Sequence, residues 1–176
     1  QGHIVKAIIR PNASLAEFDQ VSVSYTSPLE NLSWHHCGLY DVAGLEETIE
    51  DCDYVMHLAG FISYLQKDFG HMMAVNQGYA ANVVNVAKSV GVKKLLYCSS
   101  IAAITKPTKG TLVSEDIEWD KEVAHSNYGY TKHLGECEDT ERNYFDSLGV
   151  RAIAESLTGV KVMRTLLIRS GVKKAA

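Results

Sequence analysis

The sequence predicts an α/β protein, because short apolar strands alternate with longer amphipathic helices. Three apolar runs are too short for helices and are rich in β-branched or aromatic residues: Ile4–Ile9, Tyr54–Leu58 and Leu95–Ser99. None of them alternates cleanly between apolar and polar residues, which favours a parallel sheet covered by helices on both faces. Ligands of such sheets bind at the carboxyl ends of the strands.

Three helices are predicted between and after these strands. One carries an apolar stripe at three- and four-residue spacing over Ala80–Val90. A second follows Asp41, a good N-cap residue, and places Val42, Leu45 and Ile49 on one face. The third extends over about Asn127–Leu148. We expect these helices to be crossover connections of a parallel sheet.

The composition fits one globular domain and excludes several classes of protein. The chain has 176 residues, of which 46% are hydrophobic and 22% charged, enough for a single core. No stretch supplies the roughly 20 apolar residues that a membrane helix needs. With 17 Lys and Arg against 21 Asp and Glu, the net charge is −4, so we expect no nucleic-acid partner.

The cysteines and histidines predict neither a disulfide framework nor a metal site. The four cysteines lie far apart and form no CxxC pair. His35 and His36 are adjacent, but no second ligand pair accompanies them at a suitable spacing. The chain begins at Gln1 and shows no signal-peptide pattern. We therefore expect reduced thiols and a cytoplasmic location.

Candidate ligand-binding residues follow the first two predicted strands. Arg10 ends the first of them. If this strand corresponds to the second strand of a dinucleotide-binding fold, an arginine at its end accommodates a 2′-phosphate, which favours NADP over NAD. The alternative is a solvated arginine that closes a strand. Leu58, Ala59 and Gly60 end the next strand, where small residues admit a ligand to the backbone or serve a tight turn.

A set of polar residues follows the third predicted strand. Ser99 and Ser100 stand at its carboxyl end, and Tyr128 and Lys132 lie further along, four residues apart. On a helix this spacing puts the phenol and the ammonium on one face. By itself such a pair is more often a surface contact than a functional one, so its position behind the serines decides its interpretation.

Taken in order, these segments resemble the extended short-chain dehydrogenase/reductase family, nearest to its dihydroflavonol-reductase-like and sugar-nucleotide epimerase branches. The stretches that carry the resemblance are GLYDVAGLEETIEDCDYVMHLAG (38–60), VNQGYAANVVNVAKSVGVKKLLYCSS (75–100) and YGYTKHLGE (128–136). The resemblance implies a Rossmann-type doubly wound parallel sheet, a partial dinucleotide-binding domain over 1–150. Residues 151–176 are then a C-terminal segment compatible with a remnant of the substrate lobe.

The resemblance also implies roles for single positions. Asp41 and Val42 resemble the pair that contacts adenine, and Asn76 resembles the asparagine of the family's catalytic set. The implied catalytic residues are Ser100, Tyr128, Lys132 and Asn76. The implied cofactor-binding residues are Arg10, Asp41, Val42, Leu58, Ala59, Gly60, Ser99, Tyr128 and Lys132.

The chemistry of the Ser100, Tyr128 and Lys132 trio has a physical basis. A free tyrosine has a pKa near 10, so an acid/base active near neutrality needs about 4 kcal/mol from its surroundings. An adjacent ammonium supplies much of this by stabilising the phenolate. A serine hydroxyl then donates a hydrogen bond to the substrate oxygen as charge develops there.

The sequence departs from the family pattern at two places. The family's first strand and its glycine-rich turn, which seats the pyrophosphate, are not found in this sequence. Residues 1–3 resemble the end of the helix that follows that turn, so we expect a preceding segment to be missing. After Val150, residues 151–159 resemble a helix of the substrate lobe, and residues 160–176 are expected to form a strand or a helix with a solvated basic end.

The leading hypothesis is an oxidoreductase that prefers NADP(H) to NAD(H) and acts on a small carbonyl or alcohol substrate. One alternative is a nucleotide-sugar epimerase or dehydratase, and another is a non-catalytic Rossmann module that senses a nucleotide or serves as a scaffold. A homodimer is implied by the resemblance. Trp119 is expected on a loop, where it either borders the substrate cleft or packs on its own domain.

Overall fold

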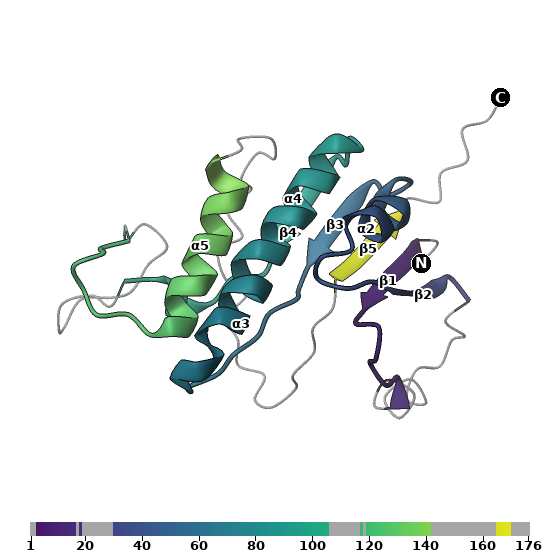
Figure 1. The fold of residues 1–176 in the computed structure, drawn as a ribbon. Helices are drawn as coiled ribbons and strands as arrows, with labels where there is room; N and C mark the ends of the chain where they lie inside the picture. Colours follow the sequence, from purple (N-terminus) through teal and green to yellow (C-terminus); the bar gives the residue numbers. More distant parts are fainter. Residues whose placement is uncertain are drawn as a thin grey trace.

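The described part of the chain forms one sheet of five strands, in the order β2-β1-β5-β3-β4 (Figure 1). The computed structural model describes residues 3–16, 18, 30–105, 117, 119–141 and 165–169. The strands are β1 (Ile4–Ile9), β2 (Leu32–His36), β3 (Tyr54–His57), β4 (Lys94–Tyr97) and β5 (Thr165–Arg169). β1 pairs with β2, and β3 with β4, in parallel. The predicted α/β class and its parallel strands are therefore confirmed.

The fifth strand joins the two parallel pairs. β5 lies between β1 and β3 and runs antiparallel to both, so that Leu167 is in register with Lys6 on one side and with Val55 on the other. Figure 1 shows it as the yellow arrow in the middle of the sheet. The C-terminal segment thus contributes a central strand, and the sheet is mixed rather than wholly parallel as the sequence had predicted.

The main helices pack side by side. α2 (Val42–Ile49) contacts α4 (Ala80–Ser89), and α4 contacts α5 (Asn127–Glu141), as Figure 1 also shows for the latter pair. α2 and α4 connect successive parallel strands in the same direction across the sheet, and right-handed crossovers then put them on the same face. The sequence predicts helices on both faces of the sheet, and most of the connection between β1 and β2 lies outside the described residues.

α4 is the last part of a longer helical run. α3 (Phe69–Met73) leads into it through a π-helical segment, Ala74–Tyr79. The predicted end of the third helix, near Leu148, lies outside the described residues, since α5 is described as far as Glu141. None of the helices described is long and apolar enough to cross a bilayer.

Local sequence explains α2 and α4. The Asp41 carboxylate accepts a hydrogen bond of 3.0 Å from the backbone N–H of Gly44, as predicted for an N-cap. Leu45 and Ile49 of α2 are no more than 1% exposed, and Val83 of α4 is fully buried in the same core cluster. Each such side chain contributes about 2 kcal/mol to folding by burial. Val42, predicted on the same face of α2, is instead 44% exposed, because it stands at the start of the helix.

β2 was not predicted from the sequence. Its residues, LSWHH, contain no apolar run, and their exposure alternates only weakly. β2 is an edge strand, paired with β1 alone from Leu32 to His36. An edge strand that covers little core is under weak pressure for hydrophobic residues, so a search for apolar runs passes over it.

Candidate active site

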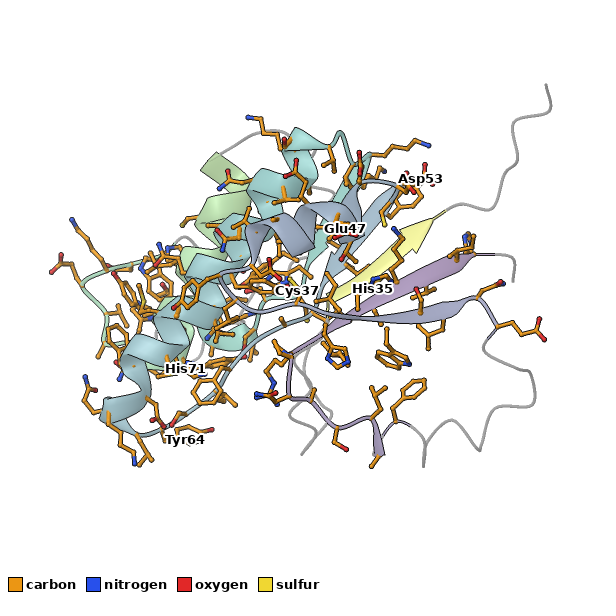
Figure 2. All side chains as sticks on the ribbon, turned by 45° about the vertical axis from the view of Figure 1, so that its right-hand side comes forward. His35, Cys37, Glu47, Asp53, Tyr64 and His71 are labelled. Carbon is orange, nitrogen blue, oxygen red and sulfur yellow. The ribbon has the colours of Figure 1, made fainter. Side chains whose placement is uncertain are left out.

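The carboxyl ends of β1, β2 and β3 enclose a cavity of about 310 Å³. Arg10 and Pro11 come from the end of β1, Cys37 and Gly38 from the end of β2, and Ala59 from the end of β3. Figure 2 labels Cys37, which follows β2 at this end of the strands, and Asp53, which precedes β3 at the other end. The cavity is therefore at the edge where an α/β sheet binds ligands.

Cys37 forms a neutral wall of this cavity. Its thiol is buried, and its one hydrogen is shared between the carbonyl oxygens of Asp41, at 3.3 Å from Sγ, and of Gly38, at 3.6 Å. Burial, together with the negative charge of Asp41, raises the pKa of the Cys37 thiol to about 11. The side chain is therefore uncharged at physiological pH, and this wall of the cavity carries no charge that would attract a phosphate.

The predicted cofactor-binding residues fall into separate groups. Arg10 and Ala59 line the cavity. Asp41 and Val42 are exposed at the start of α2, where the Asp41 carboxylate caps the helix, and they are not among the residues that line the cavity. Gly60 lies elsewhere: a Cβ atom there would stand 3.7 Å from Lys132 Nζ. Leu58, just before Ala59, is half-buried.

Lys132 is the centre of a second cluster. Its side chain projects from α5 and is only 2% exposed. The ammonium donates a hydrogen bond of 2.6 Å to the carbonyl oxygen of Cys98, immediately after β4, and stands 4.3 Å above the ring of Tyr97. The positive charge is thus held directly beside the backbone that carries Ser99 and Ser100.

The two serines differ in their hydrogen bonding. Ser100 Oγ accepts a hydrogen bond of 3.2 Å from the backbone N–H of Ala102 and so begins the 3₁₀ turn Ile101–Ala103. This bond leaves the hydroxyl hydrogen of Ser100 available for donation. Ser99 Oγ is buried and makes no hydrogen bond with any of the described residues, a state that is costly unless a ligand supplies a partner.

Tyr128 is half-buried in the first turn of α5, one turn before Lys132. This turn packs on the segment that follows Ser100: a Cβ atom at Gly129 would overlap the carbonyl oxygen of Ala102. The structure therefore brings the first two turns of α5, which carry the phenol of Tyr128 and the ammonium of Lys132, against the end of β4.

Asn76 joins three segments. It lies in the π-helical segment and is fully buried. Its Oδ1 accepts from the backbone N–H of Phe61 at 2.8 Å, while its Nδ2 donates to the carbonyl oxygen of Phe61 and to Thr131 Oγ1, both at 2.9 Å. These bonds tie the loop after β3 to α5. Asn76 holds the walls of the site together.

His57 was missed by the sequence analysis. It ends β3, is 1% exposed, and its ring lies 5.5 Å from the rings of both Tyr79 and Tyr97. Burial, with the positive charge of Lys132 adding to it, lowers the pKa of His57 to about 3. The imidazole is therefore neutral and adds no second charge beside Lys132. No spacing in the sequence distinguishes it from the other histidines.

Trp119 packs on its own domain. Its ring is stacked between the imidazoles of His125, with centroids 3.6 Å apart, and His133 of α5, 4.0 Å apart. Of the two interpretations left open by the sequence, packing is the one that these contacts support. Among the described residues no group of three His, Cys, Asp or Glu side chains is placed to hold a metal ion.

Comparison with known proteins identifies the family. A sequence profile described as the NAD dependent epimerase/dehydratase family matches residues 2–158. None of the curated proteins compared with the chain matches it. The resemblance found in the sequence to extended short-chain dehydrogenases and reductases is confirmed at this level.

Solved structures are similar in fold. WbmG of Bordetella bronchiseptica, solved with NAD and UDP, is 22% identical over 68% of this chain and 36% of that one, with a TM-score of 0.55. A short-chain dehydrogenase/reductase superfamily protein from Agrobacterium tumefaciens, with bound NAD, is 27% identical over 64% and 34%, with a TM-score of 0.53. The UDP-Glc/GlcNAc 4-epimerase of Campylobacter jejuni is 18% identical over 75% and 40%, with a TM-score of 0.59.

The matched region is only part of each solved protein. The chain spans between 34% and 40% of the length of these three, so their likeness concerns the sheet and its helices. The family profile, by contrast, covers all the residues that form β1 to β4 and α2 to α5. The chain therefore belongs to the NAD-dependent epimerase/dehydratase family.

Proposed function

We propose that the chain carries the acid/base half of an NAD(P)-dependent oxidoreductase site, which moves a hydride between the cofactor and a small carbonyl or alcohol substrate. One observation carries the proposal. The buried Lys132 ammonium is held at the Cys98 carbonyl oxygen, beside Ser99 and Ser100 and one helical turn from Tyr128. A buried charge costs free energy, and its position here is explained if it stabilises a neighbouring phenol that must ionise.

Each member of the trio has a separate task. Tyr128 gives a proton to the substrate oxygen in reduction and takes it back in oxidation. Lys132 stabilises the phenolate form of Tyr128, because an adjacent positive charge lowers the energy of a negative one. Ser100, whose Oγ is oriented by the N–H of Ala102, donates a hydrogen bond to the substrate oxygen as charge develops there.

The described residues fit the two ends of a nicotinamide dinucleotide. The cavity at Arg10, Cys37 and Ala59 suits the adenosine end, and Arg10 at its rim suits a 2′-phosphate, on which we base a preference for NADP. At the other end, the buried Ser99 hydroxyl needs a partner. When bound, the cofactor supplies the hydride, and the protein supplies orientation and the proton.

The middle of the dinucleotide is not accounted for by these residues. In the doubly wound order 3-2-1-4-5, the strand between the second and the fourth leads into the glycine-rich turn that seats the pyrophosphate. β5 occupies that position here, and it runs the other way. The sequence contains no glycine-rich turn. We therefore assign no residue of this chain to the pyrophosphate.

Cofactor binding is the first test. Thermal shift and quenching of tryptophan fluorescence with NADPH, NADH and adenosine 2′,5′-bisphosphate report which part of the cofactor binds. Binding of the bisphosphate supports the adenosine site, and the absence of binding of all three contradicts the proposal. Arg10→Asp should weaken NADPH much more than NADH, whereas an equal loss would leave Arg10 without a role in the choice of cofactor.

Turnover is the second test. Tyr128→Phe should lower the rate with a panel of aldehydes and ketones about 100-fold or more, because general acid/base catalysis is worth that much, and should leave cofactor affinity unchanged. Tyr130→Phe is the matched control, since Tyr130 lies two residues away and is exposed. Equal turnover of the two variants would remove the acid/base role from Tyr128.

A second candidate is epimerisation or dehydration of a nucleotide sugar. It is favoured by the description of the matching family, by the UDP in the WbmG structure and by the 4-epimerase among the similar structures. The same trio serves it, but the hydride returns to the substrate. Conversion of a UDP-sugar without net change in NAD(P)H absorbance would favour this candidate over the oxidoreductase, and activity with neither substrate class would favour a non-catalytic module.

We further propose a cytoplasmic homodimer with a small-molecule substrate. The cytoplasmic location is supported by the four cysteines, which are present as thiols. The homodimer is supported by the contact between α4 and α5. The family resemblance implies that these two helices from each of two subunits form a four-helix bundle. Light scattering during size-exclusion chromatography tests the dimer directly.

A further inference from the structure

Tyr97, the last residue of β4, stands where three elements meet. It is 8% exposed. Its hydroxyl lies 3.4 Å from the carbonyl oxygen of Asn76, in the π-helical segment, and 3.5 Å from the carbonyl oxygen of Lys132, in α5. Its ring lies beneath the Lys132 ammonium, 4.3 Å from the centroid to Nζ. One side chain thus contacts both the backbone and the charged end of Lys132.

The surrounding residues are shaped to admit this side chain. A Cβ atom at Gly135, on the turn of α5 after Lys132, would overlap both the Tyr97 hydroxyl and the carbonyl oxygen of Asn76. A larger residue than glycine would push α5 away from β4. The Tyr97 hydroxyl can therefore reach two carbonyl oxygens of separate helical segments only because position 135 has no side chain.

Two groups at the end of β4 stabilise the Lys132 ammonium. It is almost fully buried, so it has lost most of its hydration. The Cys98 carbonyl oxygen accepts one of its hydrogens at 2.6 Å, and the negative face of the Tyr97 ring offers a second attraction. On the side of β3 stands His57, whose pKa is lowered by burial and by this same ammonium. A neutral His57 leaves Lys132 as the positive charge of the cluster.

We propose that Tyr97 is a positioning residue for Lys132: its ring face holds the ammonium, and its hydroxyl fixes the backbone of α5 and of the π-helical segment around it. Tyr97 acts through Lys132. The proposal rests on the role proposed above for Tyr128 and Lys132, which requires the ammonium to stay close to the phenol. The competing explanation is that Tyr97 merely fills space in the core.

Two substitutions separate the parts of this role. Tyr97→Phe keeps the ring face and removes the hydroxyl, whereas Tyr97→Leu removes both and keeps an apolar side chain. If Tyr97 only filled space, the two variants would affect Lys132 in proportion to their loss of stability. If the ring face holds the ammonium, the Lys132 side chain should keep its position in Tyr97→Phe and lose it in Tyr97→Leu.

The first measurement is NMR of the lysine side chains in the cofactor-free chain. A group above an aromatic ring is shifted upfield by the ring current, so the Lys132 ε-methylene signal should lie upfield of that of Lys93, an exposed lysine. The signal is assigned by its loss in Lys132→Arg. We expect the upfield shift to persist in Tyr97→Phe and to vanish in Tyr97→Leu. A Lys132 signal that coincides with that of Lys93 in the unsubstituted chain overturns the proposal without any variant.

The second measurement separates this proposal from the proposed function. In the oxidation direction, Tyr97→Leu should move the midpoint of the pH profile of kcat upward by about one pH unit, because a displaced ammonium stabilises the Tyr128 phenolate less, and should change KM little. Tyr97→Phe should keep the original midpoint. Equal midpoints in all three proteins overturn the positioning role. No turnover in the unsubstituted chain contradicts the proposed function, while the NMR shift still tests the contact between Tyr97 and Lys132.

Discussion

Gly129, in the first turn of α5, lies against the carbonyl oxygen of Ala102, in the turn that follows Ser100. The two backbones approach this closely because residue 129 has no Cβ atom. Tyr128 precedes Gly129, and Lys132 follows it by one turn of the same helix. The contact therefore determines how near the phenol and the ammonium come to Ser100.

Gly129→Ala should destabilise the protein and displace α5. The added methyl group would overlap the Ala102 carbonyl, and overpacking of this kind costs typically 1–3 kcal/mol. Gly78→Ala is the control, because its Cβ atom would meet the nearest atom, the carbonyl oxygen of Met73, at an ordinary 3.8 Å. Urea unfolding followed by circular dichroism measures both, and equal midpoints for the two variants would show that the close approach at Gly129 is not constraining.

Gly38→Leu should abolish binding at the cavity while leaving the fold intact. The backbone of Gly38 needs no positive φ, and a Cβ atom there would meet Pro11 and Asp41 at no less than 3.9 Å, so the new side chain extends into the cavity without strain. Isothermal titration with adenosine 2′,5′-bisphosphate measures the loss. Gly70→Leu, where a Cβ atom meets nothing within 4 Å, serves as control. Unchanged affinity in Gly38→Leu would mean that the nucleotide binds elsewhere.

His57 should make the protein acid-sensitive. Its folded pKa of about 3 lies below the ordinary value of 6.5, so between these two values the unfolded chain binds a proton that the folded chain does not. The free energy of unfolding then falls as the pH is lowered through this window, by up to about 1.4 kcal/mol per pH unit. Above pH 6.5 both states are neutral and the effect disappears.

His57→Phe should reduce this slope, because phenylalanine keeps a ring between Tyr79 and Tyr97 but does not titrate. Urea unfolding at several pH values from 4 to 8 measures the slope. His3→Asn, at an exposed position, should leave it unchanged. A slope in His57→Phe as steep as in the unsubstituted chain would assign the acid sensitivity to other groups.

Leu167→Pro should separate the two halves of the sheet. Leu167 is the middle residue of β5 and is in register with Lys6 of β1 and Val55 of β3. Proline cannot donate to a ladder and is excluded from central strands, so we expect a loss of about 2 kcal/mol or more. Hydrogen exchange should show faster exchange in β1 and β3 alike, whereas Ala175→Pro, beyond the strand, should have no effect. Unchanged protection of both strands would show that β5 does not join them.

The sequence by itself determined the strands and helices in which apolar residues form a continuous run or recur at a regular spacing. The run Ile4–Ile9 forms β1 with the predicted bounds, and Asp41 caps the helix whose Leu45 and Ile49 are buried. It also determined the order of the strand-end residues, and with it the family. The family resemblance implied the roles of Ser100, Tyr128 and Lys132, and the structure places the segments that carry them in contact.

Only the tertiary structure decided which segments meet. Tyr97 and Lys132 are 35 residues apart, and nothing near either residue marks the other as its partner. β5 takes the central position of the sheet through backbone hydrogen bonds, which every residue except proline can make. The spacing of apolar residues predicts that a side chain will be buried, but it does not identify the residues that the side chain packs against. The partner is chosen when distant segments pack, and that choice created the cluster around Lys132, the neutral His57 and the central β5.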